Sequence, residues 1–123
     1  MKNINLLMSY KFSRKNRLKK KQYFQLFNKI NNKYIDKYMI FIYQYTKDIS
    51  QLGLIIKKKY VPSSVCRNFY KRLVREYFRL HKDKIKLKVI IIAKKNLYKC
   101  NKWEIKKCLQ KFWQYCMSMQ TLE

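Results

Sequence analysis

Hydrophobic positions along the chain follow two periods, one typical of helices and one typical of strands. Apolar residues at helical spacing predict helices over residues 20–30, 64–81 and 101–115. Runs rich in β-branched and aromatic residues predict strands over residues 33–35, 38–45, 52–58 and 87–93. The predicted order of elements is therefore helix, three strands, helix, strand, helix.

The strand patterns also predict how the sheet is built. Alternation over 38–45 divides its side chains into one face with Met39, Phe41, Tyr43 and Tyr45 and another with Tyr38, Ile40, Ile42 and Gln44. A turn-like run follows at 47–50, so we expect 52–58 to be the antiparallel partner of 38–45. The nearly unbroken apolar run 87–93 predicts a central strand buried on both faces. We expect an α/β (α+β) sandwich of at most three layers around a four-stranded central sheet.

The length of 123 residues fits one compact domain, because a chain of this size is too short for a second independent core. We expect residues 1–123 to form a single domain. Residues 1–15 are predicted to be a flexible basic arm and residues 116–123 a tail.

The predicted helix 64–81 has two chemically different faces. It begins after Pro62, where a serine at 63 or 64 is the expected N-cap. One half of the helical wheel carries Val65, Phe69, Tyr70, Leu73, Val74, Tyr77 and Leu80. The other half carries Arg67, Asn68, Lys71, Arg72, Arg75 and Arg79. One face is expected to pack on the sheet and the other to be cationic.

The net charge of the chain indicates the kind of molecule that it binds. Lysine and arginine total 31 against 6 acidic residues, which gives a formal charge of +25. A polyanion is the natural partner of such a protein. With 48% hydrophobic and 16% aromatic residues, the chain has enough apolar surface to fold. Lysine, asparagine and isoleucine are abundant throughout, so single surface lysines carry little information.

The cationic half of helix 64–81 is a candidate RNA-binding surface. Residues on adjacent turns of one helix face lie about 5 to 6 Å apart, which matches successive phosphates. Arginine makes bidentate contacts to phosphate and stacks on bases. The alternative is an ordinary solvated helix face.

Aromatic residues form a second candidate surface. Phe24 and Phe27 of the first helix, together with Phe41, Tyr43 and Tyr45 of a strand, would stack on unpaired bases if they were exposed. The alternative is that these rings belong to the core.

Residues for catalysis by the protein itself are sparse. The six carboxylates are scattered, and the single histidine, His81, has no partner motif and is expected at an exposed helix end. Four cysteines without metal-ligand spacing predict small buried or half-buried thiols, so we expect no cofactor on the protein alone. No signal peptide or membrane span is apparent, and a cytoplasmic protein is expected.

Four blocks in order resemble the bacterial ribonuclease P protein family. They are 16–20 with Phe24-Gln25, Gly53-Leu54 with Lys57-Lys58-Lys59, 65–79 with Arg67-Asn68 and Lys71-Arg72, and 89–95. The third block is the most specific, since it matches the family's arginine-asparagine-arginine helix. Phe69 replaces the second arginine of that motif, and the loop 60–64 lacks the usual glycine. Phe24 and Phe27 lie three residues apart, where the family favours four.

The resemblance implies an accessory subunit of an RNA enzyme that removes the 5′ leader from precursor tRNA. Its RNA subunit would hold the catalytic Mg²⁺, and the protein would be a monomer in a 1:1 complex with that RNA. The implied contacts to the catalytic RNA are Arg67, Asn68, Lys71, Arg72, Arg75 and Arg79. The implied leader contacts are Phe24, Phe27, Tyr43, Lys57, Lys58, Lys59 and Arg17.

The same resemblance implies a left-handed β-α-β crossover, although parallel strands are otherwise connected in a right-handed sense. The alternative function is that of a non-catalytic structural RNA-binding protein, such as a ribosomal protein.

Overall fold

The computed structural model describes residues 12–28 and 32–121, apart from the side chains of Phe24 and Thr121. Its elements are η1 (Arg14–Asn16), α2 (Lys20–Asn28), β1 (Asn32–Ile35), β2 (Met39–Tyr45), β3 (Gln51–Ile55), α3 (Ser64–His81), β4 (Leu87–Ala93), η2 (Leu97–Lys99) and α4 (Lys102–Thr121). The predicted order of helices and strands is confirmed, with two short 3₁₀ helices added.

The four strands form a mixed sheet in the order β1-β2-β4-β3. β4 pairs antiparallel with β2 and parallel with β3. The prediction that β3 pairs with β2 is therefore wrong, because β4 lies between them. Leu87, Val89 and Ile90 of β4 are fully buried, and a strand that is apolar on both faces is best placed between two neighbours.

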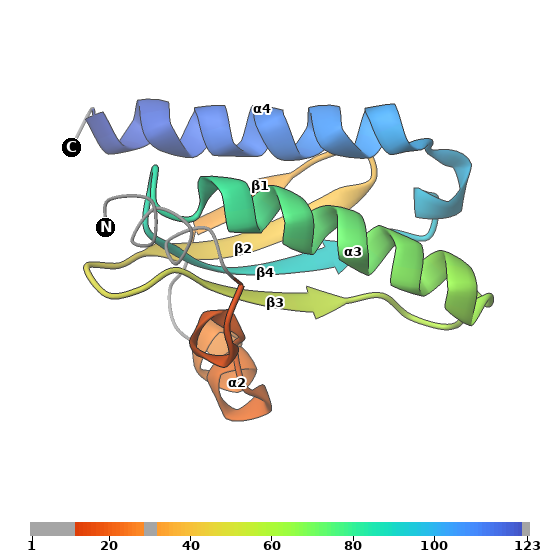
Figure 1. Cartoon of the computed structure of the whole chain (residues 1–123), viewed down its shortest axis with the longest axis horizontal. Coiled ribbons are helices and arrows are strands. Elements are labelled where there is room, and N and C mark those ends of the chain that lie inside the picture. The colour runs from red at the N-terminus through yellow and green to blue at the C-terminus, as the bar shows by residue number, and fades with distance from the viewer. Residues whose placement is uncertain (1–11, 29–31, 122–123) are drawn as a thin grey trace, which may run out of the picture.

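The connection from β3 to β4 through α3 is left-handed, as the family resemblance implies. In Figure 1 both strands run to the right, β4 lies above β3, and α3 returns in front of the sheet. That path turns in the left-handed sense, against the usual preference.

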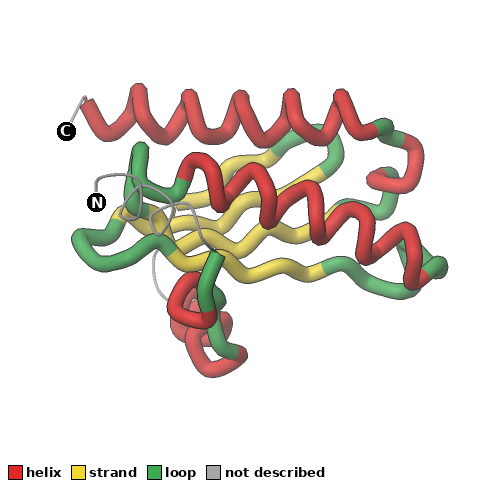
Figure 2. The backbone as a smooth tube through the Cα atoms, in the orientation of Figure 1, coloured by secondary structure: helices red, strands yellow, loops and turns green. Residues whose placement is uncertain are grey.

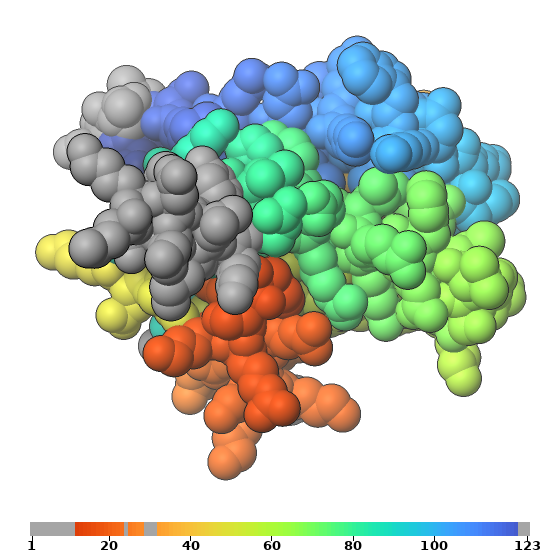
Figure 3. Space-filling model, viewed as in Figure 1, coloured from red at the N-terminus to blue at the C-terminus, as the bar shows by residue number. Residues whose placement is uncertain are grey.

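The sheet separates two unequal apolar layers. α3 and α4 lie on one face and α2 on the other, as the backbone view shows (Figure 2). On the α4 side, the rings of Phe41 and Phe112 stack with centroids 4.1 Å apart. On the α2 side, a smaller cluster joins Leu18 and Leu26 to Ile90. In the space-filling view α3 and α4 form a continuous cover over the sheet (Figure 3).

α3 packs through a narrower stripe than its wheel predicted. Its buried residues are Tyr70, Val74 and Phe78. Val65 is 77% exposed, because α3 is 18 residues long and its first turns extend beyond the end of the five-residue β3 (Figure 1). The expected N-cap is confirmed, since the Ser63 side chain accepts a hydrogen bond from the backbone N–H of Cys66.

α4 is longer than predicted. The apolar spacing of the predicted helix 101–115 favours burial of Trp103, Ile105, Leu109 and Phe112. The last three are buried, but Trp103 is 73% exposed at the first turn, so its predicted burial is wrong. The helix continues to Thr121 with Cys116 fully buried, so most of the expected tail at 116–123 is the end of α4.

The segment before α2 is held against the sheet. Of the expected flexible arm, residues 1–11 lie outside the described part, whereas the Phe12 ring meets Phe78 with centroids 5.7 Å apart. The buried Asn16 side chain donates to the Ser50 carbonyl at 2.9 Å. Ser50 Oγ in turn donates to the Lys82 carbonyl at 2.6 Å. These contacts fix the position of Arg17 relative to α3.

Candidate nucleic-acid interface

The cationic face of α3, defined as Arg67, Asn68, Lys71, Arg72, Arg75 and Arg79, is outside the packed stripe as predicted. Asn68 and Arg72 are exposed, and the other four side chains are half-buried. Lys71, Arg72 and Arg75 form no ion pair within the part of the chain that the structure describes. These three cations are therefore available to an anionic ligand.

Two arginines of this face already form contacts within the protein. The Arg67 guanidinium donates from Nη1 to the carbonyls of Val61 and Pro62, both at 2.8 Å, and so holds the loop before α3. Arg79 pairs with Glu76 at 2.5 Å, and this contact lowers the pKa of the Glu76 carboxyl. An exposed pair of this kind contributes little to stability, so RNA phosphate can compete for Arg79.

Arg17 joins α3 at a concave site that we call the arginine cleft. Its volume is about 190 Å³, and it is lined by Phe12, Arg17, Leu18, Tyr23, Leu52, Leu54, Lys71 and Arg75. Burial, and then the nearby Arg17, lower the pKa of Arg75. The Arg17 guanidinium carbon lies 5.5 Å from the centroid of the Phe12 ring. Three cations around one cleft repel one another, and a phosphate between them would remove that repulsion.

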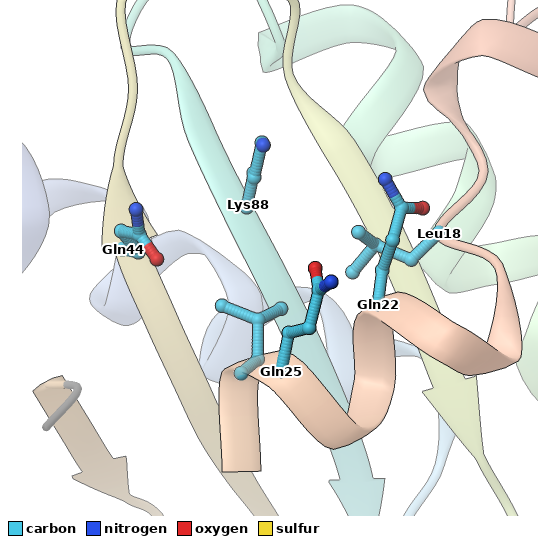
Figure 4. Close-up of a pocket in the computed structure, with 6 residues that line it drawn as sticks. Leu18, Gln22, Gln25, Gln44 and Lys88 are labelled. Atoms are coloured by element: carbon cyan, nitrogen blue, oxygen red, sulfur yellow. The ribbon is translucent and has the colours of Figure 1, made fainter. Parts of the chain in front are cut away.

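A second hollow, the glutamine cleft, lies between α2 and the sheet. It is lined by Leu18, Gln22, Gln25, Leu26, Gln44 and Lys88 and has a volume of about 50 Å³. Figure 4 shows Gln22 and Gln25 on α2 beside Gln44 on β2 and Lys88 on β4, with their polar ends pointing the same way. Amides both donate and accept hydrogen bonds, although Gln22 Oε1 already accepts one from the Lys19 N–H at 2.7 Å. With the positive charge of Lys88, the rim of this small cleft can contact the edge of a base or a phosphate.

Gly53 allows α2 to sit close to the sheet. A Cβ at this position would lie 2.6 Å from Cζ of Tyr23, so only glycine leaves room for the ring. The Tyr23 hydroxyl accepts a hydrogen bond from the Leu54 N–H at 3.1 Å. α2, which carries two of the glutamines, is thereby anchored to β3.

Comparison with known proteins decides between the two candidate functions. A family model described as Ribonuclease P matches residues 12–117. The chain belongs to this family. Its relatives include ribonuclease P protein components from Pseudomonas fluorescens, 37% identical over 86% of the chain and 82% of that protein, and from Fusobacterium nucleatum, 42% identical over 65% and 74%.

Another relative, the ribonuclease P protein component of Baumannia cicadellinicola, is 47% identical over 51% of the chain, and the match spans 56% of that protein. Solved ribonuclease P proteins share the fold. One from Staphylococcus aureus has a TM-score of 0.72 at 26% identity over 82% of the chain and 94% of that protein. The protein from Thermotoga maritima has a TM-score of 0.66 at 23% identity over 80% and 96%. These findings favour a ribonuclease P component over a ribosomal-type protein.

Tyr43 does not lie where the ribonuclease P resemblance placed it. It is 3% exposed, and its ring centroid is 5.2 Å from that of Phe112 on α4. Burial raises its pKa. The family resemblance also implies that this strand face lies beneath the first helix, and that expectation is wrong, because the face packs on α4. The opposite face, with Gln44, meets α2.

Phe24 and Phe27 of α2 were expected to contact the leader, and the structure describes the side chain of Phe27 alone. Phe27 is 42% exposed and is not among the residues that line the glutamine cleft. The side chain of Phe24 lies outside the described part of the structure. Phe27 is not brought together with Tyr43, because the Tyr43 ring is buried against α4.

Lys57, Lys58 and Lys59 are exposed, but they lie away from α2. They follow β3 at the right-hand end of Figure 1, whereas α2 is at the lower left. The structure thus separates them from the glutamine cleft. Arg17, also expected among the leader contacts, lines the arginine cleft instead.

Sequence reasoning missed Gln22, Gln25, Gln44 and Lys88. One signal was available, since Lys88 is the single charged residue in the apolar run 87–93. A charged residue within a central strand indicates that one face is open to solvent at that point. Gln22 and Gln44 gave no signal, because a single amide on a helix or a strand is ordinary. Gln25 belongs to the first block of the family resemblance, but no role was assigned to it.

Two of the described carboxylates accept hydrogen bonds from neighbouring side chains. Asp36 accepts a hydrogen bond from the Cys108 thiol at 2.8 Å, and Glu104 accepts one from the Tyr38 hydroxyl at 2.8 Å. His81 is half-buried, stacks on Tyr77 at 3.9 Å, and has a pKa lowered chiefly by burial, so the expected exposed position is wrong. Within the described residues, no helix has the length and hydrophobicity needed to cross a membrane.

Proposed function

We propose that this protein is the accessory subunit of a ribonuclease P holoenzyme. It binds the catalytic RNA and the 5′ leader of precursor tRNA, and it assists endonucleolytic removal of the leader by the RNA subunit. One protein molecule binds one RNA.

One observation carries the proposal. Lys71 and Arg75 on α3 line one cleft together with Arg17, which lies just before α2. None of the residues that line this cleft is a carboxylate. Rigid cations over a packed core bind a folded RNA backbone at low entropic cost, because their positions are already fixed.

The α3 cations and the arginine cleft hold phosphates of the catalytic RNA. The glutamine cleft holds leader nucleotides, through amide hydrogen bonds from Gln22, Gln25 and Gln44 and an ionic contact from Lys88. Contacts of this kind increase affinity for a precursor and leave affinity for mature tRNA unchanged, since mature tRNA has no leader.

The proposal assigns the catalytic Mg²⁺ to the RNA. Within residues 12–28 and 32–121, no three histidine, cysteine or acidic side chains gather in a way that fits a metal ion. When bound, Mg²⁺ would activate the attacking water and stabilise the leaving oxygen. The protein residues described above only bind and orient the RNA.

The test is the salt dependence of binding to a bacterial ribonuclease P RNA. The variant Lys71→Ala, Arg72→Ala, Arg75→Ala should flatten the slope of log K against log salt by about 2 to 3, since each phosphate contact contributes about 0.7 to 0.9. Arg67 is left intact because it holds the loop before α3.

The matched control is Lys106→Ala, Lys107→Ala, Lys111→Ala on the exposed side of α4, which removes the same charge. This control should keep most of the original slope. Equal slopes for the two triple variants would show that the α3 face is not the binding surface.

A further inference from the structure

A third hollow lies at the end of the sheet away from α2. β3 and β4 are parallel neighbours, so the loops after their carboxyl ends lie side by side, at the right of Figure 1. Together they line a cavity of about 280 Å³ with Lys59, Tyr60, Lys95, Asn96, Tyr98 and Lys99. We call it the lysine-tyrosine cleft.

The lysines of this cleft have no counter-charge. Lys59, Lys95 and Lys99 are exposed, and none forms an ion pair in the described part of the chain. No carboxylate lines the cleft. Lysines are abundant in this chain, so charge alone would not single out this site.

Two aromatic rings distinguish the site from an ordinary lysine-rich surface. Tyr98 is 59% exposed, and the Lys99 ammonium lies 5.8 Å from its ring centroid. The Lys57 ammonium lies 5.6 Å from the ring centroid of Tyr60, which is half-buried, so Tyr98 is the exposed ring of the site. Exposed rings beside cations are the usual platform for unpaired bases.

The loop that presents Tyr98 is well anchored. Leu97 beside it is 2% exposed, and the Cys100 N–H donates to the Leu97 carbonyl at 2.9 Å. A ring on a fixed 3₁₀ turn loses little entropy when a base stacks on it.

Asn96 adds a hydrogen-bonding group to the cleft. Its Oδ1 is buried and has no hydrogen-bond partner among the described residues. A buried acceptor without a donor is unfavourable. Rotation of the Asn96 side chain would bring this oxygen to the cleft, where the amino group of adenine or cytosine is a suitable donor.

We propose that the lysine-tyrosine cleft binds a single-stranded segment of RNA. One base stacks on Tyr98, and neighbouring phosphates contact Lys59, Lys95 and Lys99. The inference rests on the proposed RNA-binding function, but it concerns a surface separate from the α3 face and the glutamine cleft.

The test compares Tyr98→Leu, which removes the ring, with Tyr98→Phe, which keeps it. The probes are a fluorescein-labelled 12-nucleotide oligo(A), an abasic backbone of the same length, and ribonuclease P RNA. Tyr98→Leu should weaken oligo(A) binding about 5- to 100-fold, and Tyr98→Phe should stay within about twofold of the original. Neither variant should change binding of the abasic backbone.

A cross-linking experiment locates the base directly. An oligonucleotide with 5-iodouridine, irradiated on the full-length protein, should attach to the peptide that contains Tyr98. If Tyr98→Leu weakens binding of ribonuclease P RNA, the RNA that binds the cleft is the catalytic RNA. If it weakens binding of oligo(A) alone, the cleft binds another single-stranded RNA.

Unchanged oligo(A) affinity in Tyr98→Leu, an equal loss on the abasic backbone, or cross-links confined to other peptides would overturn the inference. The α3 triple variant is measured in parallel. If it weakens binding of ribonuclease P RNA while Tyr98→Leu changes nothing, the proposed function stands and only this site is lost.

Discussion

At the scale of single residues, alternation divided the faces of β2 correctly but did not tell which helix each face meets. Met39, Phe41 and Tyr43 are buried together, as their spacing predicts. Which layer covers them depends on how the distant α4 packs, and no local pattern contains that information. The Tyr43 face was therefore expected beneath the first helix, whereas it packs on α4.

Tyr43→Ala should destabilise the protein by about 3 to 5 kcal/mol, the usual cost of deleting a large buried aromatic side chain. Urea denaturation measures this loss. Tyr43→Phe keeps the ring against Phe112 and should leave both stability and the preference for precursor over mature tRNA almost unchanged. A Tyr43→Ala protein with normal stability and a selective loss of leader binding would show that Tyr43 is a leader contact.

Gly53→Ala should destabilise the protein by about 1 to 3 kcal/mol, because the new methyl group overlaps the Tyr23 ring and displaces it from its hydrogen bond to Leu54. The measurement is again urea denaturation. Adding Tyr23→Ala removes the overlap, so Gly53→Ala should cost much less in that background. An equal loss of stability in both backgrounds would show that the overlap with the Tyr23 ring is not the cause.

At the scale of elements, local periodicity predicted the helices and strands to within a few residues, except for the C-terminal end of α4, but it did not predict the pairing of β3. Chain neighbours usually pair, and the turn at 47–50 favoured a hairpin. The apolar run of β4 instead takes the central place and accepts β3 on its far edge. Periodicity also predicted burial at the first turns of α3 and α4, where Val65 and Trp103 are exposed.

α4 and the turn before it carry thiols that should make stability sensitive to alkaline pH. Burial raises the pKa of Cys100 to about 11 and that of Cys116 to about 12. Burial, and then the hydrogen bond to Asp36, raise the pKa of Cys108 to about 12. Unfolded thiols ionise near pH 8.5, so the stabilisation is complete below that pH and is lost as pH rises toward 11 to 12.

Urea denaturation at several pH values should therefore show a constant free energy of unfolding up to about pH 8 and a decline from about pH 9. As a control at pH 8, a thiol reagent should label the exposed Cys66 in the native protein and all four cysteines in urea. Rapid labelling of the other three in the native state would mean that they are not buried.

At the scale of the whole molecule, the three clefts named above lie around one small sheet. The arginine cleft and the glutamine cleft lie on either side of the segment that carries Leu18, and the lysine-tyrosine cleft lies at the opposite end of the strands. A net charge of +25 attracts RNA to every side, so position and rigidity decide which cations matter. The α3 cations could be predicted from sequence because one helix carries them. The clefts could not, because their residues come from separate elements.

The most direct measurement of the central claim is leader cleavage in a reconstituted holoenzyme. A bacterial ribonuclease P RNA is incubated with precursor tRNA at a Mg²⁺ concentration too low for the RNA alone, with or without the purified protein. We predict that the protein restores accurate 5′ cleavage, that the α3 triple variant does so only at higher protein concentration, and that the α4 control triple behaves like the original protein. Cleavage that remains absent with every bacterial RNA tested, although the folded protein binds that RNA, would contradict the proposed function.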